Sequence, residues 1–245
     1  MDLNIMIVSG LTIIIAALIQ GLTGFGFALV AVPILSSFLL PKEVVPMMVV
    51  YSLVMNILMF LQQKRFVQLK ELRVLIVFGL IGIPFGVYLL NALSAQTIKL
   101  VAALLIIGTS MMMMIGWQWK TKSDFLSSAI AGLLSGILNG STSMSGPPIV
   151  LFLANKKVGK ESFRASLPTY GIITNLITLG FFLLSGNFNR TILINVIVFA
   201  PGLLIGLAIG MVLIKKVPEA VFRKMSLILI LITGLYTFVS VVAAS

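Results

Sequence analysis

The sequence contains no histidine and no cysteine, and it has only six acidic residues among 245. The absence of His and Cys removes the commonest ligands of zinc and haem, the thiolates of iron–sulfur clusters, cysteine nucleophiles and disulfides. Six carboxylates offer little material for a metal cage, so we expect no metal and no cofactor. We also expect no enzyme, because no histidine base and no pair of intramembrane carboxylates is available to activate a serine.

Charge of either sign is scarce as well, at 9% of residues, whereas hydrophobic residues make up 60%. A soluble domain of this size does not need that balance, so the composition indicates a polytopic membrane protein embedded in the lipid bilayer. The formal net charge of +11 does not indicate nucleic acid binding. Lys and Arg stand in short connections between apolar runs, where such residues set topology. The N-terminus, MDLNIMIV, lacks a basic region and a cleavage site, which favours a retained first helix over a signal peptide.

Ten apolar runs can be read along the chain, and a spanning helix needs about 20 apolar residues. The runs are, in chain order, 3–20, 24–40, 44–61, 74–93, 97–117, 125–138, 147–155, 166–185, 191–214 and 225–243. The second, sixth and seventh are shorter than an ordinary span. We therefore predict an all-α bundle of membrane helices in which some segments do not cross the bilayer alone.

Most of the 17 basic residues gather in four connections between these runs. The connections are 62–73, 120–124, 156–164 and 215–224. The positive-inside rule places all four in the cytoplasm and both termini outside, for a protein of the inner cell membrane. Runs 125–138 and 147–155 lie between two inner connections, so they must form a hairpin, and the same reasoning makes the first two runs a hairpin. Each half, 1–119 and 120–245, is then a broken or re-entrant hairpin followed by three spanning helices.

The two halves face opposite ways in this topology, which predicts an inverted-topology repeat. Residue matches support it. YSLVMN at 51–56 matches YGIITN at 170–175 with an offset of 119, and GIPFG at 82–86 matches GLLIG at 202–206 with an offset of 120. Each match alone could arise by chance in a membrane sequence, but their order and nearly constant offset favour a repeat.

A hydroxyl-rich break, NGSTSMSGPP at 139–148, separates two short apolar runs. These runs are too short to carry the break across a bilayer, so we expect it within the membrane, where unpaired backbone groups are tolerated only in an enclosed or watered cavity. Pro147 or Pro148 suits the first turn of the helix that follows, and a helix N-terminus favours an anion. We interpret the break as a binding site for a small anionic substrate. The alternative is that its small residues merely permit tight helix packing.

The first hairpin has a similar turn at 23–26, preceded by the amide of Gln20. Asn56 and Asn175 are amides inside otherwise apolar spans, so each is either a contact between helices or a ligand. Their pairing by the repeat makes both readings equally open. The predicted substrate-binding residues are Gln20, Thr23, Gly24, Gly26, Asn56, Asn139, Ser141, Thr142, Ser143, Ser145, Gly146 and Asn175.

Other features have simpler explanations in packing. Tyr51 and Tyr170 are interpreted as packing residues, and Met111–Met114 as lipid-facing and packing residues rather than a copper site. The glycines at helical GxxxG spacing indicate close helix contacts; they are Gly82, Gly86, Gly202, Gly206 and Gly210. No Asp, Glu, Lys or Arg is expected inside a span, which leaves no intramembrane carboxylate for a proton relay.

The motifs QGLTGFGFALVAVP at 20–33 and SGPPIVLFLA at 145–154 resemble the TauE/SafE sulfite exporter family, also described as probable membrane transporter proteins. The resemblance covers nearly the whole chain, through its length, its two halves, the broken first segment of each half and the basic connections. It implies export of sulfite, sulfonates or related sulfur-containing organic anions. It also implies that residues 20–26 and 139–148 line the substrate, whereas Asn56 and Asn175 come from the internal repeat alone.

The leading prediction is an exporter of a small sulfur-containing oxyanion that works by alternating access between the halves. One alternative is an importer or exporter of another organic anion, such as a carboxylate, because helix ends suit any anion. An alternative of another class is a membrane-embedded assembly partner that carries no substrate. A homo-oligomer is possible, and the sequence leaves the oligomeric state open.

Overall fold

The structure is a computed structural model. It describes residues 3–94 except 68, residues 96–98, 100, 104, 107–108 and 111, residues 123–218 except 157, and the single positions 221, 228, 232 and 239. The predicted runs 97–117 and 225–243, including Met112–Met114, therefore lie almost entirely outside the described residues. Within the described ranges every regular element is a helix, as predicted.

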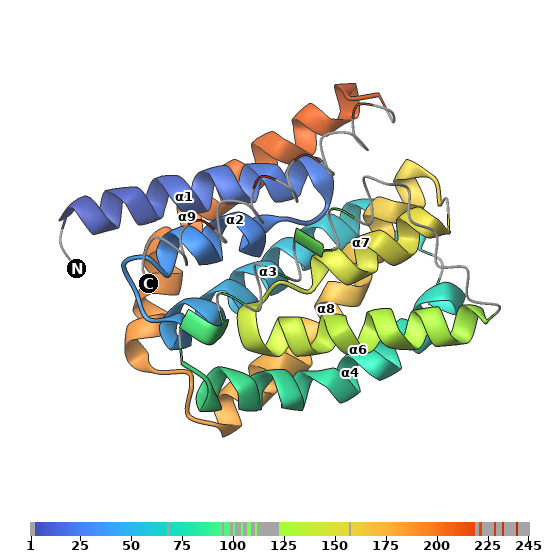
Figure 1. Cartoon of the computed structure of the whole chain (residues 1–245). Coiled ribbons are helices and arrows are strands. Elements are labelled where there is room, and N and C mark those ends of the chain that lie inside the picture. Colours follow the sequence, from blue (N-terminus) through green and yellow to red (C-terminus); the bar gives the residue numbers. More distant parts are fainter. Residues whose placement is uncertain are drawn as a thin grey trace.

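The helices follow the apolar runs closely (Figure 1). In chain order they are α1 (Leu3–Thr23), α2 (Phe27–Leu35), α3 (Pro41–Gln63), the short 3₁₀ helix η1 (Lys64–Phe66), α4 (Leu69–Ala92), α6 (Asp124–Thr142), α7 (Gly146–Asn155), α8 (Lys160–Leu184), α9 (Arg190–Leu213) and the 3₁₀ helix η2 (Ile214–Lys216). Six of them are long and apolar enough to cross a bilayer, namely α1, α3, α4, α6, α8 and α9 with their 3₁₀ extensions. Helices α2 and α7, with 9 and 10 residues, are half the length that a span needs.

The breaks in the two hairpins are shorter than the sequence indicated. Helix α6 continues through Asn139 and ends at Thr142, and α7 begins at Gly146, so only three residues of the ten-residue break are non-helical. The first hairpin breaks in the same way over residues 24–26, between α1 and α2. Polar and small residues were read as a loop, but a helix tolerates them where their hydroxyls bond to its own carbonyls.

Three helix pairs build the bundle, which Figure 1 shows as layers: α1 on α9, α3 on α8, and α4 on α6. The outer two pairs approach closely through glycine, as GxxxG spacing predicted. A Cβ on Gly136 of α6 would overlap the carbonyl of Gly79 of α4, and a Cβ on Gly21 of α1 would lie 2.9 Å from Gly210 Cα of α9. Small residues let helix backbones approach closely, and packing of this kind is a main force between helices in lipid.

The outer surface carries the apolar side chains that a bilayer requires. Helix α9 exposes Ile197, Val198, Ile205 and Val212 by half or more. In water such a continuous apolar face would be an aggregation site, whereas in lipid it is the expected surface of a spanning helix.

The two ends of the bundle differ in charge. The connections around Lys64, Lys160 and Lys215 gather at one end, where the turns of α3, α8 and α9 share a cavity, and Lys156 forms an ion pair of 2.5 Å with Asp124. At the other end, the Asn187 and Asn91 side chains bond to each other at 2.8 Å. Lys120, Lys122, Lys157, Arg223 and Lys224 lie outside the described residues.

Candidate functional site

A small cavity lies where the two broken hairpins meet. Its walls come from the turn between α1 and α2, the turn between α6 and α7, and the middle of α3 and of α8. The volume open to the centre of a water-sized sphere is about 40 Å³, room for roughly three waters or one small ion. The predicted site residues on its wall are Gln20, Gly24, Gly26, Asn56, Ser143, Ser145, Gly146 and Asn175.

The first turn depends on two glycines in the left-handed region and on Gln20. Gly24 has φ of 90° and Gly26 of 102°, values that favour glycine because it lacks a Cβ. The Gln20 carbonyl oxygen Oε1 accepts a hydrogen bond from Phe27 N at 3.2 Å, which satisfies one free N–H at the start of α2. Its Nε2 donates to Asn56 Oδ1 at 3.1 Å. Gln20 therefore joins the turn to α3 and orients the Asn56 amide.

The second turn has a different chemistry. Ser143 stands at φ of 59°, the left-handed position that Gly24 holds in the first turn. Ser135 Oγ donates to the Ser145 carbonyl at 2.7 Å and anchors the turn to α6. Pro147 and Pro148 both lie in the first turn of α7, and proline has no N–H to donate. The expected set of free N–H donors at this helix end is therefore reduced, and donors on this side must come from serine hydroxyls and Gly146.

The polar wall lies halfway along the two central helices. Asn56 of α3 faces Gly171 of α8 so closely that a Cβ on Gly171 would overlap the Asn56 Nδ2 atom. Asn175 lies one turn further along α8 and is 1% exposed. Because α3 and α8 are both long enough to span, a cavity at their middle lies near the middle of a bilayer, where discontinuous helices commonly form transporter sites.

Two buried polar atoms on the cavity wall have no hydrogen-bond partner among the described residues. They are the hydroxyl oxygen of Ser143 and the amide oxygen Oδ1 of Asn175. A buried polar group left unpaired costs about 1–3 kcal/mol, so such atoms are rarely kept without a purpose. The hydroxyl offers a donor and the amide oxygen an acceptor, and both belong to residues that line the cavity.

Four of the predicted site residues do not line the cavity. Thr23 donates to the Ile19 carbonyl at 2.9 Å, Ser141 to Ile137 at 2.7 Å, and Thr142 to Leu138 at 2.8 Å. The Ser141 and Thr142 hydroxyls bond to the preceding turn of their own helix, the local competition typical of Ser and Thr in helices, whereas the Thr23 hydroxyl also bonds to the Phe25 carbonyl in the first turn. Asn139 is fully buried between α6 and α8, where its Nδ2 donates to Thr178 at 2.9 Å. This bond joins the two helices, while the Asn139 Oδ1 atom has no hydrogen-bond partner among the described residues.

Sequence reasoning missed a buried cation. Arg164 was assigned to an inner connection, but it lies in the second turn of α8 and is only 5% exposed. Its Nη2 donates to the Gly21 carbonyl at 3.1 Å and its Nη1 to the Leu22 carbonyl, at the C-terminal end of α1. A cation there neutralises the negative end of the helix dipole. Helix α8 begins at Lys160, before the apolar run 166–185, so hydropathy alone places Arg164 in the connection.

Several wall residues were also not predicted. Tyr170, interpreted as packing, is 1% exposed and lines the cavity as well. Phe25 and Met144, inside the two segments that the family resemblance implied, line it too, whereas Ser52, Leu167 and Gly171 line it without any earlier prediction. Apolar lining residues have no polar signature, so pattern alone could not separate them from the core.

The fold and the cavity define a polytopic helical membrane protein with a small, partly polar cavity between two broken hairpins. That is the general design of membrane transporters with discontinuous helices. The chain belongs to the TauE/SafE sulfite exporter family, whose model matches residues 9–237. Searches of curated proteins and of solved structures gave no significant match.

Proposed function

We propose that this chain is a secondary transporter that moves a small sulfur-containing oxyanion, sulfite or an organosulfonate, out of the cell across the cytoplasmic membrane. The substrate would bind in the central cavity between the two turns. The observation that carries the proposal is the pair of unpaired atoms, Ser143 Oγ and Asn175 Oδ1, on the wall of the central cavity. Membership of a sulfite exporter family supports the substrate class.

The wall chemistry favours a singly charged anion. None of the described residues that line the cavity is charged, and burying a dianion without a cation nearby costs far more than burying a monoanion. The helix end at Phe27 contributes a partial positive charge, and Ser143 contributes a hydroxyl donor. Asn175 Oδ1 accepts only, so an anion that also carries a donor, such as hydrogensulfite or an aminosulfonate, satisfies both atoms.

The arrangement of the helices supports alternating access between two inverted halves. The pair α1 on α9 and the pair α4 on α6 each join the first helix of one half to the last described helix of the other. Gly206 faces the Ile14 carbonyl and Gly82 faces the Leu133 carbonyl, and Ile14 and Leu133 are themselves 119 residues apart. These contacts support a pairing of Gly82 with Gly206, one helical turn further along than the sequence match to Gly202.

The direction follows from the charge of the substrate. Without an intramembrane carboxylate on the cavity wall, the membrane potential itself is the simplest driving force, and it is worth about 2.3 kcal/mol per charge per 100 mV. A cell that is negative inside expels an anion by this route. We infer that the anion is exported by uniport, without a coupled ion, and that the basic end of the bundle faces the cytoplasm.

Changing Ser143 to glycine is expected to lower anion flux about five- to tenfold, because the net contribution of one hydrogen bond is about 1–1.4 kcal/mol. Glycine keeps the left-handed turn, since Gly24 occupies the same conformation in the first turn. Asn175→Ala is expected to act in the same direction. Flux of labelled sulfite from proteoliposomes measures both.

The matched control is Ser141→Ala, which removes a hydroxyl that bonds within its own helix. Its flux is expected to stay within about twofold of the parent, because only a local hydrogen bond is lost. Equal losses in Ser141→Ala and Ser143→Gly would contradict the assignment of the cavity.

A further inference from the structure

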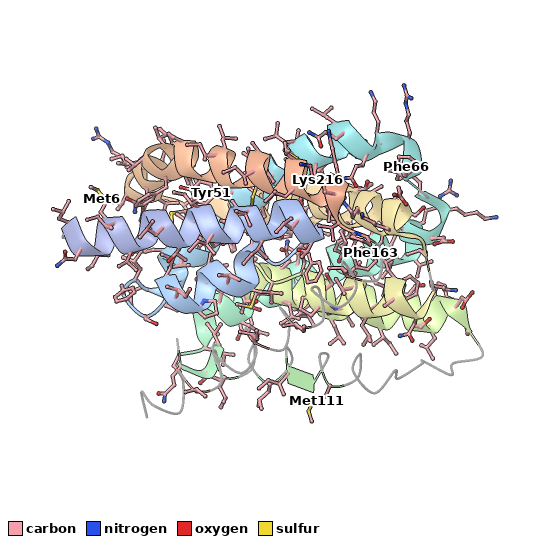
Figure 2. All side chains as sticks on the ribbon, turned by 90° about the horizontal axis from the view of Figure 1, so that it is seen from above. Met6, Tyr51, Phe66, Met111, Phe163 and Lys216 are labelled. Carbon is pink, nitrogen blue, oxygen red and sulfur yellow. The ribbon has the colours of Figure 1, made fainter. Side chains whose placement is uncertain are left out.

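A second, larger cavity opens at the basic end of the bundle. It lies between the end of α3, the start of α8 and the end of α9 with η2, and its volume is about 580 Å³. We call it the vestibule, and its polar walls come from Gln62, Gln63, Lys160, Glu161, Arg164 and Lys215. Figure 2 shows Phe66, which also lines it, and Lys216 toward the same end of the molecule, away from Met6 of α1.

The charge of the vestibule is positive. Three basic side chains and one acidic side chain line it. Arg164 is the buried member, and in the described part of the chain no carboxylate lies within ion-pair distance of it. Its hydrogen-bond partners are neutral: the carbonyls of Gly21 and Leu22, and the Gln63 amide, which accepts from Nη2 at 3.2 Å when its oxygen faces the guanidinium. The one carboxylate that acts on it electrostatically is Glu161, among the described residues, and it forms no ion pair with Arg164. Neutral acceptors stabilise a guanidinium without cancelling its charge, so the vestibule attracts anions.

Arg164 also marks the boundary between the vestibule and the central cavity. Leu167, three residues along α8, lines the central cavity. The first turn packs against both, because a Cβ on Gly24 would lie 3.8 Å from Arg164 Cα and 3.7 Å from Leu167. The two cavities are thus separated by about one turn of α8 and by the end of α1.

We propose that the vestibule is a second anion-binding site, which loads the central cavity from the basic side, and that Arg164 is its principal ligand. The inference rests on the proposed function for the identity of the anion, a sulfite or sulfonate group. The volume admits an organic tail that the 40 Å³ central cavity does not hold in this conformation. An anion in the vestibule competes with the Gly21 and Leu22 carbonyls for the guanidinium, since a charged acceptor forms the stronger hydrogen bond. Loss of those contacts frees the end of α1 and opens the way to the first turn.

The test exploits two neighbouring lysines of η2. Lys215 lines the vestibule and Lys216 does not, although both are exposed. Equilibrium binding of ³⁵S-sulfite to the purified full-length protein in detergent is measured for Lys215→Gln and Lys216→Gln. We expect Lys215→Gln to weaken the binding about three- to fivefold, as for the loss of a partly exposed charge contact, and Lys216→Gln to leave it within twofold. Arg164→Gln is expected to abolish the binding of sulfite to the vestibule, and Arg164→Lys to restore part of that binding.

Three results would overturn the proposal. Equal shifts in the two lysine variants would show a general surface potential only. No shift in Lys215→Gln together with unchanged binding in Arg164→Gln would show that the vestibule is not a ligand site. Loss of sulfite binding when phosphatidylglycerol is added to the micelles would assign the basic cavity to a lipid headgroup. Binding that depends on Lys215, in a protein that shows no flux, would refute the transport function and leave the vestibule site standing.

Discussion

Changing Gly171 to alanine is expected to lower anion flux about tenfold or more, which corresponds to a barrier higher by about 1.4 kcal/mol. The added methyl group would overlap the Asn56 amide nitrogen, and the amide must then turn or move. Its oxygen is held by Gln20 Nε2 at 3.1 Å, so movement breaks the link between the first turn and α3. The distortion therefore reaches the wall of the central cavity without removing a polar group. Flux from proteoliposomes, normalised to folded protein, measures it.

Gly180→Ala is the matched control, because it makes the same change on the same helix. A Cβ at Gly180 has no atom within 4 Å, and alanine favours helix over glycine by about 1 kcal/mol. This variant should fold and transport as the parent does. Normal flux in Gly171→Ala would show that the Gln20–Asn56 pair is packing alone.

Changing Gly136 to alanine is expected to have the largest effect on stability, with a loss of folded protein. Gly136 of α6 packs against the backbone of Gly79 of α4, and a Cβ there would overlap the Gly79 carbonyl and approach its Cα at 3.0 Å. Overpacking against side chains costs about 1–3 kcal/mol, and a backbone atom relaxes less readily than a side chain. The helices must separate, and lipid provides no hydrophobic force to hold them together.

The measurement is the yield of monodisperse protein in detergent and its midpoint of thermal unfolding, again beside Gly180→Ala. A midpoint for Gly136→Ala equal to that of the control would show that α4 and α6 are not packed through these glycines. Gly82→Ala should lower the midpoint of thermal unfolding in the same way, because a Cβ on Gly82 would overlap the Leu133 carbonyl.

Composition and hydrophobic length were enough to predict the class of fold. Runs such as 44–61 and 191–214 became α3 and α9 with boundaries shifted by a few residues, because a span must be apolar over about 20 residues. The short α7 was also visible, since Pro147 and Pro148 begin a helix and basic residues follow its end. The extent of the helices at the turns was not visible, because Asn139 to Thr142 look like loop residues and yet continue α6.

The candidate site could be predicted in part, for a physical reason. Turn positions with left-handed backbone, Gly24 and Gly26, are marked by residue type, and the buried amides Gln20, Asn56 and Asn175 are conspicuous in apolar surroundings. The residue type of a serine, in contrast, does not indicate which way its hydroxyl points. Ser141 and Ser143 are two residues apart, yet one bonds within its helix and the other faces the cavity, because the helix ends between them. Arg164 was missed because a helix that starts in a basic connection buries a cation that hydropathy assigns to the loop.

The central claim is that the chain transports a small sulfur oxyanion through the cavity between the two turns. The most direct measurement is ³⁵S-sulfite flux in proteoliposomes under an imposed membrane potential, with taurine, sulfoacetate, sulfate and acetate as competitors. We predict a saturable flux whose direction reverses with the sign of the potential. Sulfonates should inhibit this flux better than sulfate or acetate do. The flux should be lower in Ser143→Gly and unchanged in Ser141→Ala. Flux from folded parent protein no greater than from empty liposomes would contradict the account, and flux inhibited best by acetate would contradict the substrate class.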